Sequence, residues 1–355
     1  MLNLQDKPVP VKWEYLQHML LSMGEFYYWP NDGNLGDYLI AEATRQLFRQ
    51  FGLKWKEYNP EIPPIDASYN IVYGGGGRFV PHWGGMDIFQ KHLTAPQVSK
   101  CIILPHSING VDDFISSLDE RHVVFCREYK TLDYCCAVNT TAQFVLAHDM
   151  GLYIQMEKLP SLHRVVSLPA GAESESKAQA QLLTCRQLSR IYEKIRWSAV
   201  RINSRSIAFL LRTDREKQTS HSSLLSFDLS LVYSASCRES PYSSQLVRMM
   251  AEALRIPDVI VTDRLHVAIM AMHVGKEVYM LDNDYGKLSG VYEVSLKDKP
   301  NVHLIPPGTA WPEEIDAAWQ RLNAPWRRFA YGTRFIFPAK IWNISRKILK
   351  RILMR

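Results

Sequence analysis

Three polar residues stand between two apolar runs in the segment Asp263-Arg264-Leu265-His266. The preceding residues DVIVT are typical of a buried strand, and the following residues VAIMAMHVG are typical of a buried helix. Arg264 would then lie at a helix N-terminus, where the macrodipole disfavours a cation unless an anion binds beside it. The segment therefore predicts an anion site that includes Arg264. We expect Asp263 to cap the helix and Leu265 to anchor the turn in the core. The alternative is that Asp263 is only a cap, with Arg264 and His266 merely exposed in the first turn.

Polar side chains also follow the other predicted strands. In the first half of the chain these are Asn34, Asp37, Arg78, His106, Ser107, Arg127, Glu128, His148 and Asp149. In the second half they are Arg212, Asp214, Arg215, Asp282, Asn283, Asp284, Tyr285 and Lys287. Ligands of open α/β sheets bind outside the carboxyl ends of the strands. A purely structural explanation would have to account for each of these groups separately, so we expect a binding site there.

Known catalytic motifs are missing from the sequence. The glycine run at 74–77 is not followed by the Lys-Ser/Thr of a phosphate-binding loop, and it does not fit the dinucleotide fingerprint. It indicates either a close approach of the backbone to a ligand or a tight turn. The six cysteines form no metal-ligand pattern, so we expect reduced, mostly buried thiols and no catalytic metal.

Two series of alternating strands and helices predict the elements that must position these groups. In the first series, strands are expected in NIVY, CIILPHSI, HVVFC and QFVLA, with a helix in NLGDYLIAEATRQLFRQFG. In the second, strands are expected in SIAFLLRTD, DVIVTD and KEVYMLDND, with a further candidate in DLSLVYSA. Helices are expected in SSQLVRMMAEALR, RLHVAIMAMHVG and WPEEIDAAWQRLN. This order implies parallel sheets built from right-handed β-α-β units.

The length of 355 residues accommodates two such domains. The stretch 159–178 is rich in Pro, Gly, Ser and Glu and is the best linker candidate, and a helical run of unassigned role follows it to about residue 200. We therefore expect two Rossmann-like α/β domains at 1–165 and 205–326. A linker with a helical insertion occupies 166–204, and a separate tail occupies 327–355.

The positive charge of the chain is concentrated in that tail. Of the 42 Lys and Arg residues, nine lie in 327–355, which contains no acid; the first 326 residues therefore hold 33 cations and 36 acids. At helical spacing the tail presents Ile341, Trp342, Ile344, Arg346, Lys347, Ile348, Lys350 and Arg351. This pattern predicts a basic amphipathic helix on an anionic membrane surface, or alternatively a stripe that packs on the body or on a partner subunit.

Other locations and partners are less consistent with the sequence. The N-terminus has no signal-peptide pattern, and no apolar run approaches the ~20 residues that a membrane span requires. Because the body is slightly acidic and has no known nucleic-acid-binding module, we do not expect a nucleic-acid partner. A cytoplasmic protein, peripheral on the inner face of the cell membrane, is the expectation.

Taken together, the motifs resemble the polysaccharide pyruvyl transferase family. The matching segments are NDGNLGDYLIAEA, IVYGGGGRF, ILPHSI, FCREYKTLD, FLLRTDRE, VIVTDRLHVAIMAMHVGKEV and LDNDYGKLSGVYE, in the family's order over roughly residues 30–295. The resemblance implies two Rossmann-type domains in a GT-B-like arrangement with the active site in the cleft between them. It also implies transfer of a pyruvyl group from phosphoenolpyruvate to two sugar hydroxyls as a cyclic ketal. The family's donor-contacting arginines and histidine match Arg212, Arg264 and His266.

Phosphoenolpyruvate carries a phosphate and a carboxylate, so its site needs several cations, which Arg212, Arg264 and Lys287 can supply. We expect His266 to protonate the vinyl carbon, Asp37 to accept the hydroxyl proton and Arg264 to assist. Further substrate contacts are expected from Asn34, Gly75, Gly76, His106, Arg127 and Tyr285. No cofactor is required.

The expected acceptor is a lipid-linked sugar of an exopolysaccharide or capsule, and a homo-oligomer is possible. Residues 171–204 and those after 326 lie outside the resemblance. Two other readings stay open from the sequence. One is a nucleotide-sugar glycosyltransferase of the same architecture, and the other is a non-catalytic, membrane-attached sugar-binding assembly protein.

Overall fold

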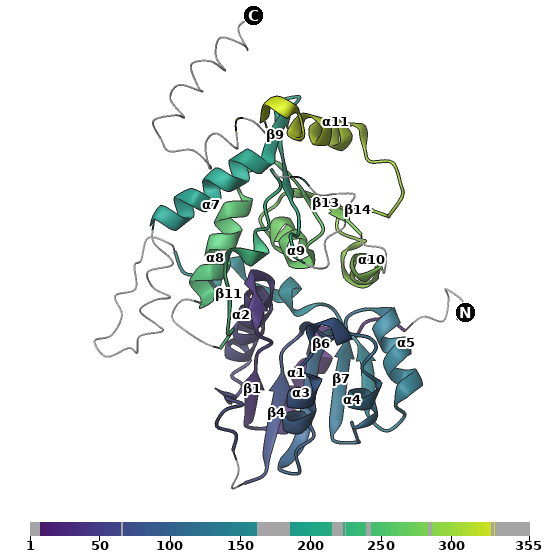
Figure 1. Cartoon of the computed structure of the whole chain (residues 1–355). Helices are drawn as coiled ribbons and strands as arrows, with labels where there is room; N and C mark the ends of the chain where they lie inside the picture. Colours follow the sequence, from purple (N-terminus) through teal and green to yellow (C-terminus); the bar gives the residue numbers. More distant parts are fainter. Residues whose placement is uncertain are drawn as a thin grey trace, which may run out of the picture.

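The computed structural model describes residues 8–64, 67–161, 185–214, 223, 225–238, 243–282, 286–327 and 330. These residues form two large β-sheets, each dominated by parallel pairing, a small two-stranded sheet, and helices that pack on both faces of each large sheet (Figure 1). The α/β class predicted from the alternating pattern is therefore confirmed. Within the described residues, no helix is both long enough and apolar enough to span a bilayer. The predicted amphipathic helix of the tail lies outside the described residues.

The first sheet has the strand order β3-β1-β4-β6-β7-β8, with β5 paired to β6, and every pairing is parallel. Its strands are β1 (Phe26–Trp29), β3 (Trp55–Glu57), β4 (Tyr69–Tyr73), β5 (Gly76–Phe79), β6 (Val98–Ile108), β7 (His122–Cys126) and β8 (Gln143–Leu146). One face packs on α1 (Trp13–Met23) and α2 (Leu35–Gln50). The other packs on α3 (Met86–Leu93), α4 (Asp112–Ser116) and α5 (Tyr129–Val138). Successive side chains on β4 and β6 enter opposite cores, as the period of two of a strand requires.

The second sheet has the order β14-β13-β12-β10-β9. Its strands are β9 (Ala199–Ile202), β10 (Arg205–Leu210), β12 (Val259–Thr262), β13 (Glu277–Leu281) and β14 (Val302–Ile305). Only the β9–β10 pairing is antiparallel. One face is covered by α7 (Cys185–Ser198), α8 (Ser243–Leu254), α9 (Leu265–His273) and α10 (Lys287–Val291). The opposite face is covered by α11 (Glu313–Leu322).

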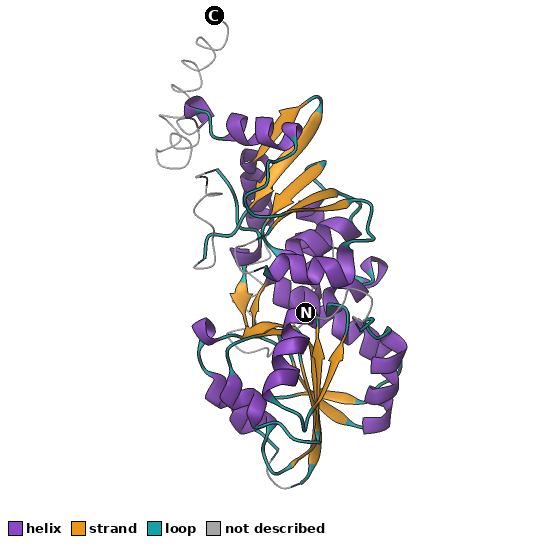
Figure 2. Cartoon of the chain, turned by 90° about the vertical axis from the view of Figure 1, so that its right-hand side faces the viewer, coloured by secondary structure: helices purple, strands orange, loops and turns teal. Residues whose placement is uncertain are grey.

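Helix α2 is shared by the cores of both sheets. The sequence predicts a single apolar face for this helix, but the structure buries nearly all of it. Ile40, Leu47 and Phe48 pack against the first sheet, whereas Leu39 and Ala43 join the core formed with α8 and α9. Figure 2 shows the resulting layer of helices between the two sheets. The position of α2 therefore links the strand ends of one sheet to those of the other.

A second connection between the two halves of the chain is made by a segment that was expected to form a strand of the second sheet. The stretch 228–235 does not join that sheet; it forms a short 3-10 turn at Ser230–Val232 and then β11 (Ser234–Ala235). β11 pairs antiparallel with β2 (Gly33–Asn34), just before α2. The Asp32 carboxylate accepts hydrogen bonds from the Ser236 hydroxyl and the Cys237 N–H, and the Tyr38 hydroxyl donates to the Ser236 carbonyl. The prediction of a further strand in the second sheet is wrong: residues 234–235 pair with β2, and Asp32 and Tyr38 bind the two residues that follow.

The remaining predicted strands and helices are confirmed, including the helical run before residue 200, which is α7. A short additional strand, β5, follows the glycine run. The second sheet already begins at Ala199. The domain boundaries at 165 and 205 stay predictions.

Candidate active site

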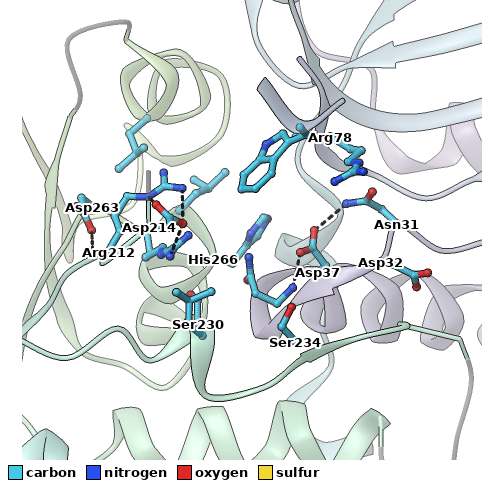
Figure 3. Close-up of a pocket in the computed structure, with 18 of the residues that line it drawn as sticks. Asn31, Asp32, Asp37, Arg78, Arg212, Asp214, Ser230, Ser234, Asp263 and His266 are labelled. Carbon is cyan, nitrogen blue, oxygen red and sulfur yellow. Dashed lines mark hydrogen bonds and ion pairs between the residues drawn. The ribbon is translucent and has the colours of Figure 1, made fainter. Parts of the chain in front are cut away.

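A pocket of about 340 Å³ lies where the N-termini of α2 and α9 face each other (Figure 3). Residues from the strand ends of both sheets line it. From the first part of the chain these are Asn31, Asp32, Gly33, Asn34, Asp37, Gly77, Arg78, Trp83 and Arg127. From the second part they are Arg212, Asp214, Ser230, Leu231, Ser234, Asp263, Arg264, Leu265, His266 and Leu288. Six predicted site residues, Asn34, Asp37, Arg127, Arg212, Arg264 and His266, are thus brought together.

A capping box at the start of α2 positions Asp37. The Asn34 side chain accepts a hydrogen bond from the Gly36 N–H at 2.8 Å, and Asp37 Oδ2 accepts one from the Asn34 N–H at 2.8 Å. Asp37 Oδ1 accepts a third from Asn31 Nδ2, also at 2.8 Å. Burial raises the pKa of Asp37 above its ordinary value, and nearby His266 and these hydrogen bonds offset part of that rise. Asp37 is therefore rigidly held and more basic than an ordinary aspartate.

The imidazole of His266 packs against this first turn of α2. A Cβ built at Gly36 would lie 2.6 Å from His266 Nδ1, so only glycine allows the approach. His266 Nε2 lies 3.4 Å from Asp149 Oδ2, which also accepts a hydrogen bond from Arg127 Nη1 at 2.7 Å. Burial opposes the ionisation of Asp149, but His266, Arg127 and the Gly151 N–H hold its pKa well below the ordinary value. Asp149 is therefore a fixed anion that orients both His266 and Arg127.

On the opposite wall, two arginines are held in a network of aspartates. Arg264 Nη2 lies 2.6 Å from Asp228 Oδ2 and 2.7 Å from Asp214 Oδ2. Arg212 Nε donates to Asp214 Oδ1 at 3.0 Å, so Asp214 bridges the two guanidinium groups. Burial opposes the ionisation of Asp214, but Arg212 and Arg264 hold its pKa below the ordinary value. The two cations are adjacent, as an anion site needs, and each already has a carboxylate partner.

The structure corrects the expected geometry of the Asp263–His266 segment. The N-cap of α9 is Arg264, not Asp263, and its side chain makes no capping hydrogen bond. The Asp263 carboxylate turns instead toward β10 and accepts the Arg212 N–H at 2.7 Å, while Thr262 Oγ1 accepts the Arg264 N–H. Arg264 is not exposed in the first turn, because its aspartate partners hold it with 7% of its surface accessible. Leu265 is buried in the core, as expected.

Three predicted contacts lie away from the pocket wall. Gly75 and Gly76 do not line it; Gly77 does. A Cβ at Gly75 would lie 2.8 Å from the Pro105 carbonyl oxygen, so that glycine accommodates the chain's own backbone. His106 is fully buried, and its Nε2 accepts the Arg78 N–H at 3.0 Å, so it supports the loop that carries Arg78 and does not face the pocket.

Two further predicted contacts are not tested by the geometry. Tyr285 and the side chain of Lys287 lie outside the described residues, although Lys287 begins α10.

The sequence assigns no specific role to several residues of the site. Asp149 and Asp214 follow strands and belong to the polar strand-end groups named above, a signal that could have singled them out. Asp228 carries no sequence signal, because it belongs to the stretch that was expected to form a strand. Trp83 lines the pocket from a short 3-10 turn and keeps 41% of its surface exposed. Only the folded arrangement of the β5–α3 connection places it there.

The charge of Asp263 has a measurable consequence for stability. Burial raises its pKa to about 6, and Arg212 and Arg264 offset only part of the effect. The folded protein therefore binds more protons than the unfolded chain between about pH 4 and pH 6, and its stability falls as pH rises through that range. Asn at this position keeps an oxygen for the Arg212 N–H without the charge.

We expect Asp263→Asn to be more stable than the parent above pH 7, by on the order of 1–3 kcal/mol. The difference should shrink toward zero near pH 4, where Asp263 is protonated in the folded protein. Urea unfolding at a series of pH values measures this. A stability difference that does not change with pH would contradict the interpretation.

Comparisons with known proteins identify the family of the chain. The chain matches the family model described as polysaccharide pyruvyl transferase over residues 34–285. A curated Bacillus subtilis (strain 168) protein named "Putative pyruvyl transferase EpsO" is 24% identical over 297 residues, which cover 78% of this chain and 86% of that protein. A crystal structure of an uncharacterised Klebsiella pneumoniae protein is 27% identical with a TM-score of 0.60, over 84% of this chain and 98% of that one. The family match spans most of the residues that build the pocket, and the chain belongs to the polysaccharide pyruvyl transferase family.

Proposed function

We propose that the protein transfers a pyruvyl group from phosphoenolpyruvate to two hydroxyls of a sugar, forming a cyclic ketal and releasing phosphate. The observation that carries this proposal is the composition of one pocket. An imidazole, His266, lies between a basic carboxylate, Asp37, and two adjacent guanidinium groups, Arg212 and Arg264. Proton transfer and binding of a multiply charged anion are the two things that this reaction requires.

The donor would bind on the arginine wall. In the structure Asp214 bridges Arg212 and Arg264 as an anionic group of a ligand would, while Asp228 and Asp263 hold the two residues from behind. We infer that the phosphate or carboxylate of phosphoenolpyruvate replaces the Asp214 carboxylate. Arg127, fixed by Asp149 and Ser107, faces the same pocket and adds a third guanidinium. Lys287, at the start of α10, is proposed as a further cation.

His266 delivers a proton to C3 of the donor, and C2 becomes electrophilic. The first sugar hydroxyl attacks C2 while Asp37 takes its proton; the C2–O bond to phosphate then breaks, and the second hydroxyl closes the ring. Of the two hydroxyl protons, one replaces the proton that His266 gave to the new methyl group, and the other leaves with phosphate. The raised pKa of Asp37 favours its role as the base. These steps require no metal and no cofactor.

The arrangement proposed for these steps is GT-B-like, with donor and acceptor meeting in the cleft between two Rossmann-like domains. The lining of the pocket by strand ends of both sheets supports this assignment. The donor then lies against the second sheet, and the sugar of the acceptor lies beside Trp83 and Arg78 on the side of the first. An exposed indole at a polar pocket is suited to packing against the apolar face of a sugar ring.

We further propose that the acceptor is a lipid-linked repeat unit of an exopolysaccharide or capsule and that the protein lies on the inner face of the cell membrane. The support for this is the basic amphipathic pattern of residues 327–355. An enzyme held at the membrane surface would meet such an acceptor by diffusion in two dimensions.

Replacement of His266 tests the chemistry directly. His266→Gln should lower kcat by roughly 10²–10⁴-fold while phosphoenolpyruvate still binds, because the proton donor is lost and the arginine wall remains. Phosphate release together with the mass gain of the sugar measures turnover. His303→Gln, at a histidine with 43% of its side chain exposed, is the matched control and should leave turnover unchanged. Near-normal turnover by His266→Gln would overturn the assignment.

Replacement of Asp214 tests the donor wall. Asp214→Asn removes the carboxylate that competes for Arg212 and Arg264, so we expect the Kd for phosphoenolpyruvate to fall about three- to tenfold. Isothermal titration calorimetry measures the Kd, and Asp316→Asn, an exposed acid on α11, serves as the control for net charge. If Kd rises instead, Asp214 positions the arginines for the ligand and does not occupy its place.

Removal of the tail tests the proposed location. The full chain should co-sediment with vesicles that contain phosphatidylglycerol, whereas a chain ending at Ala330 should stay in the supernatant, because seven of the tail's nine cations and its apolar stripe are gone. Neutral phosphatidylcholine vesicles are the control for charge. Undiminished binding of the shortened chain would exclude the tail as the anchor.

A further inference from the structure

A second cavity, of about 560 Å³, adjoins the candidate active site. Leu231 lines both cavities, and Asp228 in the wall of the second is ion-paired with Arg264 in the wall of the first. A ligand that extends beyond the first pocket past Leu231 therefore enters the second. Neither the family resemblance nor the roles proposed above use this cavity. One of its walls is formed by α7, the helical run to which the sequence assigned no role.

Two cations of α7 face this cavity. Arg190 and Lys194 are four residues apart and therefore lie on the same side of the helix, about one turn from each other. Lys194 Nζ lies 5.3 Å from the centre of the Phe227 ring. In the described part of the chain neither side chain is paired with a carboxylate. The carboxylate in the wall, Asp228, is already bound by Arg264 and by the Thr213 N–H, so the local field of the cavity is positive.

The rest of the lining is largely apolar and aromatic. Leu225, Phe227, Val232, Tyr233, Leu246 and Met249 contribute to it. Paired cations beside an apolar surface match a ligand that carries phosphate next to a hydrocarbon or ring system. Inorganic phosphate alone would leave this apolar surface unused.

α7 also leads toward the tail. Arg327, the last described residue before the tail's remaining cations, donates from Nη2 to the Trp197 carbonyl at 2.7 Å and to the Ala199 carbonyl at 3.0 Å. Trp197 lies three residues beyond Lys194, less than one helical turn along the axis. The start of the tail therefore contacts the end of the helix that carries Arg190 and Lys194. Figure 1 shows α7 lying alongside α8 at this end of the second sheet.

We propose that this cavity binds the diphosphate and the first apolar carbons of a lipid-diphosphate-linked acceptor, whose sugar lies in the first pocket. Arg190 and Lys194 hold the diphosphate, and the apolar lining holds the start of the lipid. The inference rests on the proposed function for its sugar and donor, but the binding of a diphosphate here does not depend on catalysis. A nucleoside diphosphate shares the charged group, so the test must separate the two.

Equilibrium binding tests whether the cavity binds a lipid diphosphate, and it does not require catalytic turnover. Farnesyl diphosphate should bind the full chain, and Arg190→Gln/Lys194→Gln should weaken this binding by at least roughly tenfold, because both phosphate contacts are removed. Glutamine keeps a polar side chain and a similar helix propensity at these exposed positions. Arg196→Gln/Arg201→Gln removes the same charge from exposed residues that do not line the cavity, and it should bind like the parent.

UDP, measured at the same concentrations, tests the alternative ligand, a nucleoside diphosphate. Stronger binding of UDP than of farnesyl diphosphate, lost in the same variant, would replace the lipid with a nucleotide and overturn the proposal. Binding of farnesyl diphosphate that is equal in the parent and in Arg190→Gln/Lys194→Gln would also overturn it, as would no binding at all.

Kinetics with an accepted sugar provide a separate readout. The double variant should raise KM for the farnesyl-diphosphate-linked sugar by roughly tenfold, with kcat, the KM for phosphoenolpyruvate and the KM for the p-nitrophenyl glycoside of the same sugar unchanged. An equal rise in KM for both acceptors would mean that the two residues have a structural role and do not bind the diphosphate, which would overturn the proposal. If the parent shows no pyruvyl transfer to any acceptor, the proposed function fails, while the binding experiment still decides the cavity.

Discussion

The burial of helix α2 between the two sheets is the contact on which the arrangement of the site depends. One side of the helix belongs to the core of the first sheet, and the other side packs on α8 and α9 of the second. The buried Arg45, paired with Glu57 and bonded to the Cys237 carbonyl, ties the same helix to the β11 segment. A helix with two apolar sides cannot rotate without exposing one of them. The N-terminus of α2 is therefore fixed opposite that of α9, and Asp37 is held near His266.

Electrostatics divide the pocket into two unlike walls. On the α2 side, buried carboxylates are held by amides, by Arg127 and by His266, and the fixed anion Asp149 orients the imidazole. On the α9 side, two guanidinium groups share two aspartates, Asp214 and Asp228. Buried charges are stable only when they are paired, so a cluster of buried arginines needs carboxylates of the protein as partners. The aspartates neutralise the charges of Arg212 and Arg264. An anionic ligand must therefore either displace these carboxylates or bind beside them.

Much of the fold could be predicted from the sequence because strands and helices carry local signals. Period-two and apolar runs located the parallel strands, and Asn34 followed by Asp37 three residues later is a capping pattern readable without coordinates. The failures have a common cause. The stretch 228–235 has the composition of a strand, but its last two residues pair with β2, some 200 residues earlier, and Asp32 and Tyr38 bind the two residues that follow. Asp263 has the type of an N-cap, but the Arg212 N–H is a better placed donor than those of its own helix.

The sequence by itself determined the α/β class, the family, and the residue types that gather at the strand ends, since these depend on local periodicity and on motifs whose members are close together along the chain. Tertiary structure alone decided how the charges are paired. Asp149 meets His266 across 117 residues, and Asp228 meets Arg264 across 36. The tertiary structure also decided that the His266 imidazole packs directly against Gly36 and that α7 forms a wall of a second cavity. Such contacts depend on how the helices pack between two sheets, and no local pattern encodes that packing.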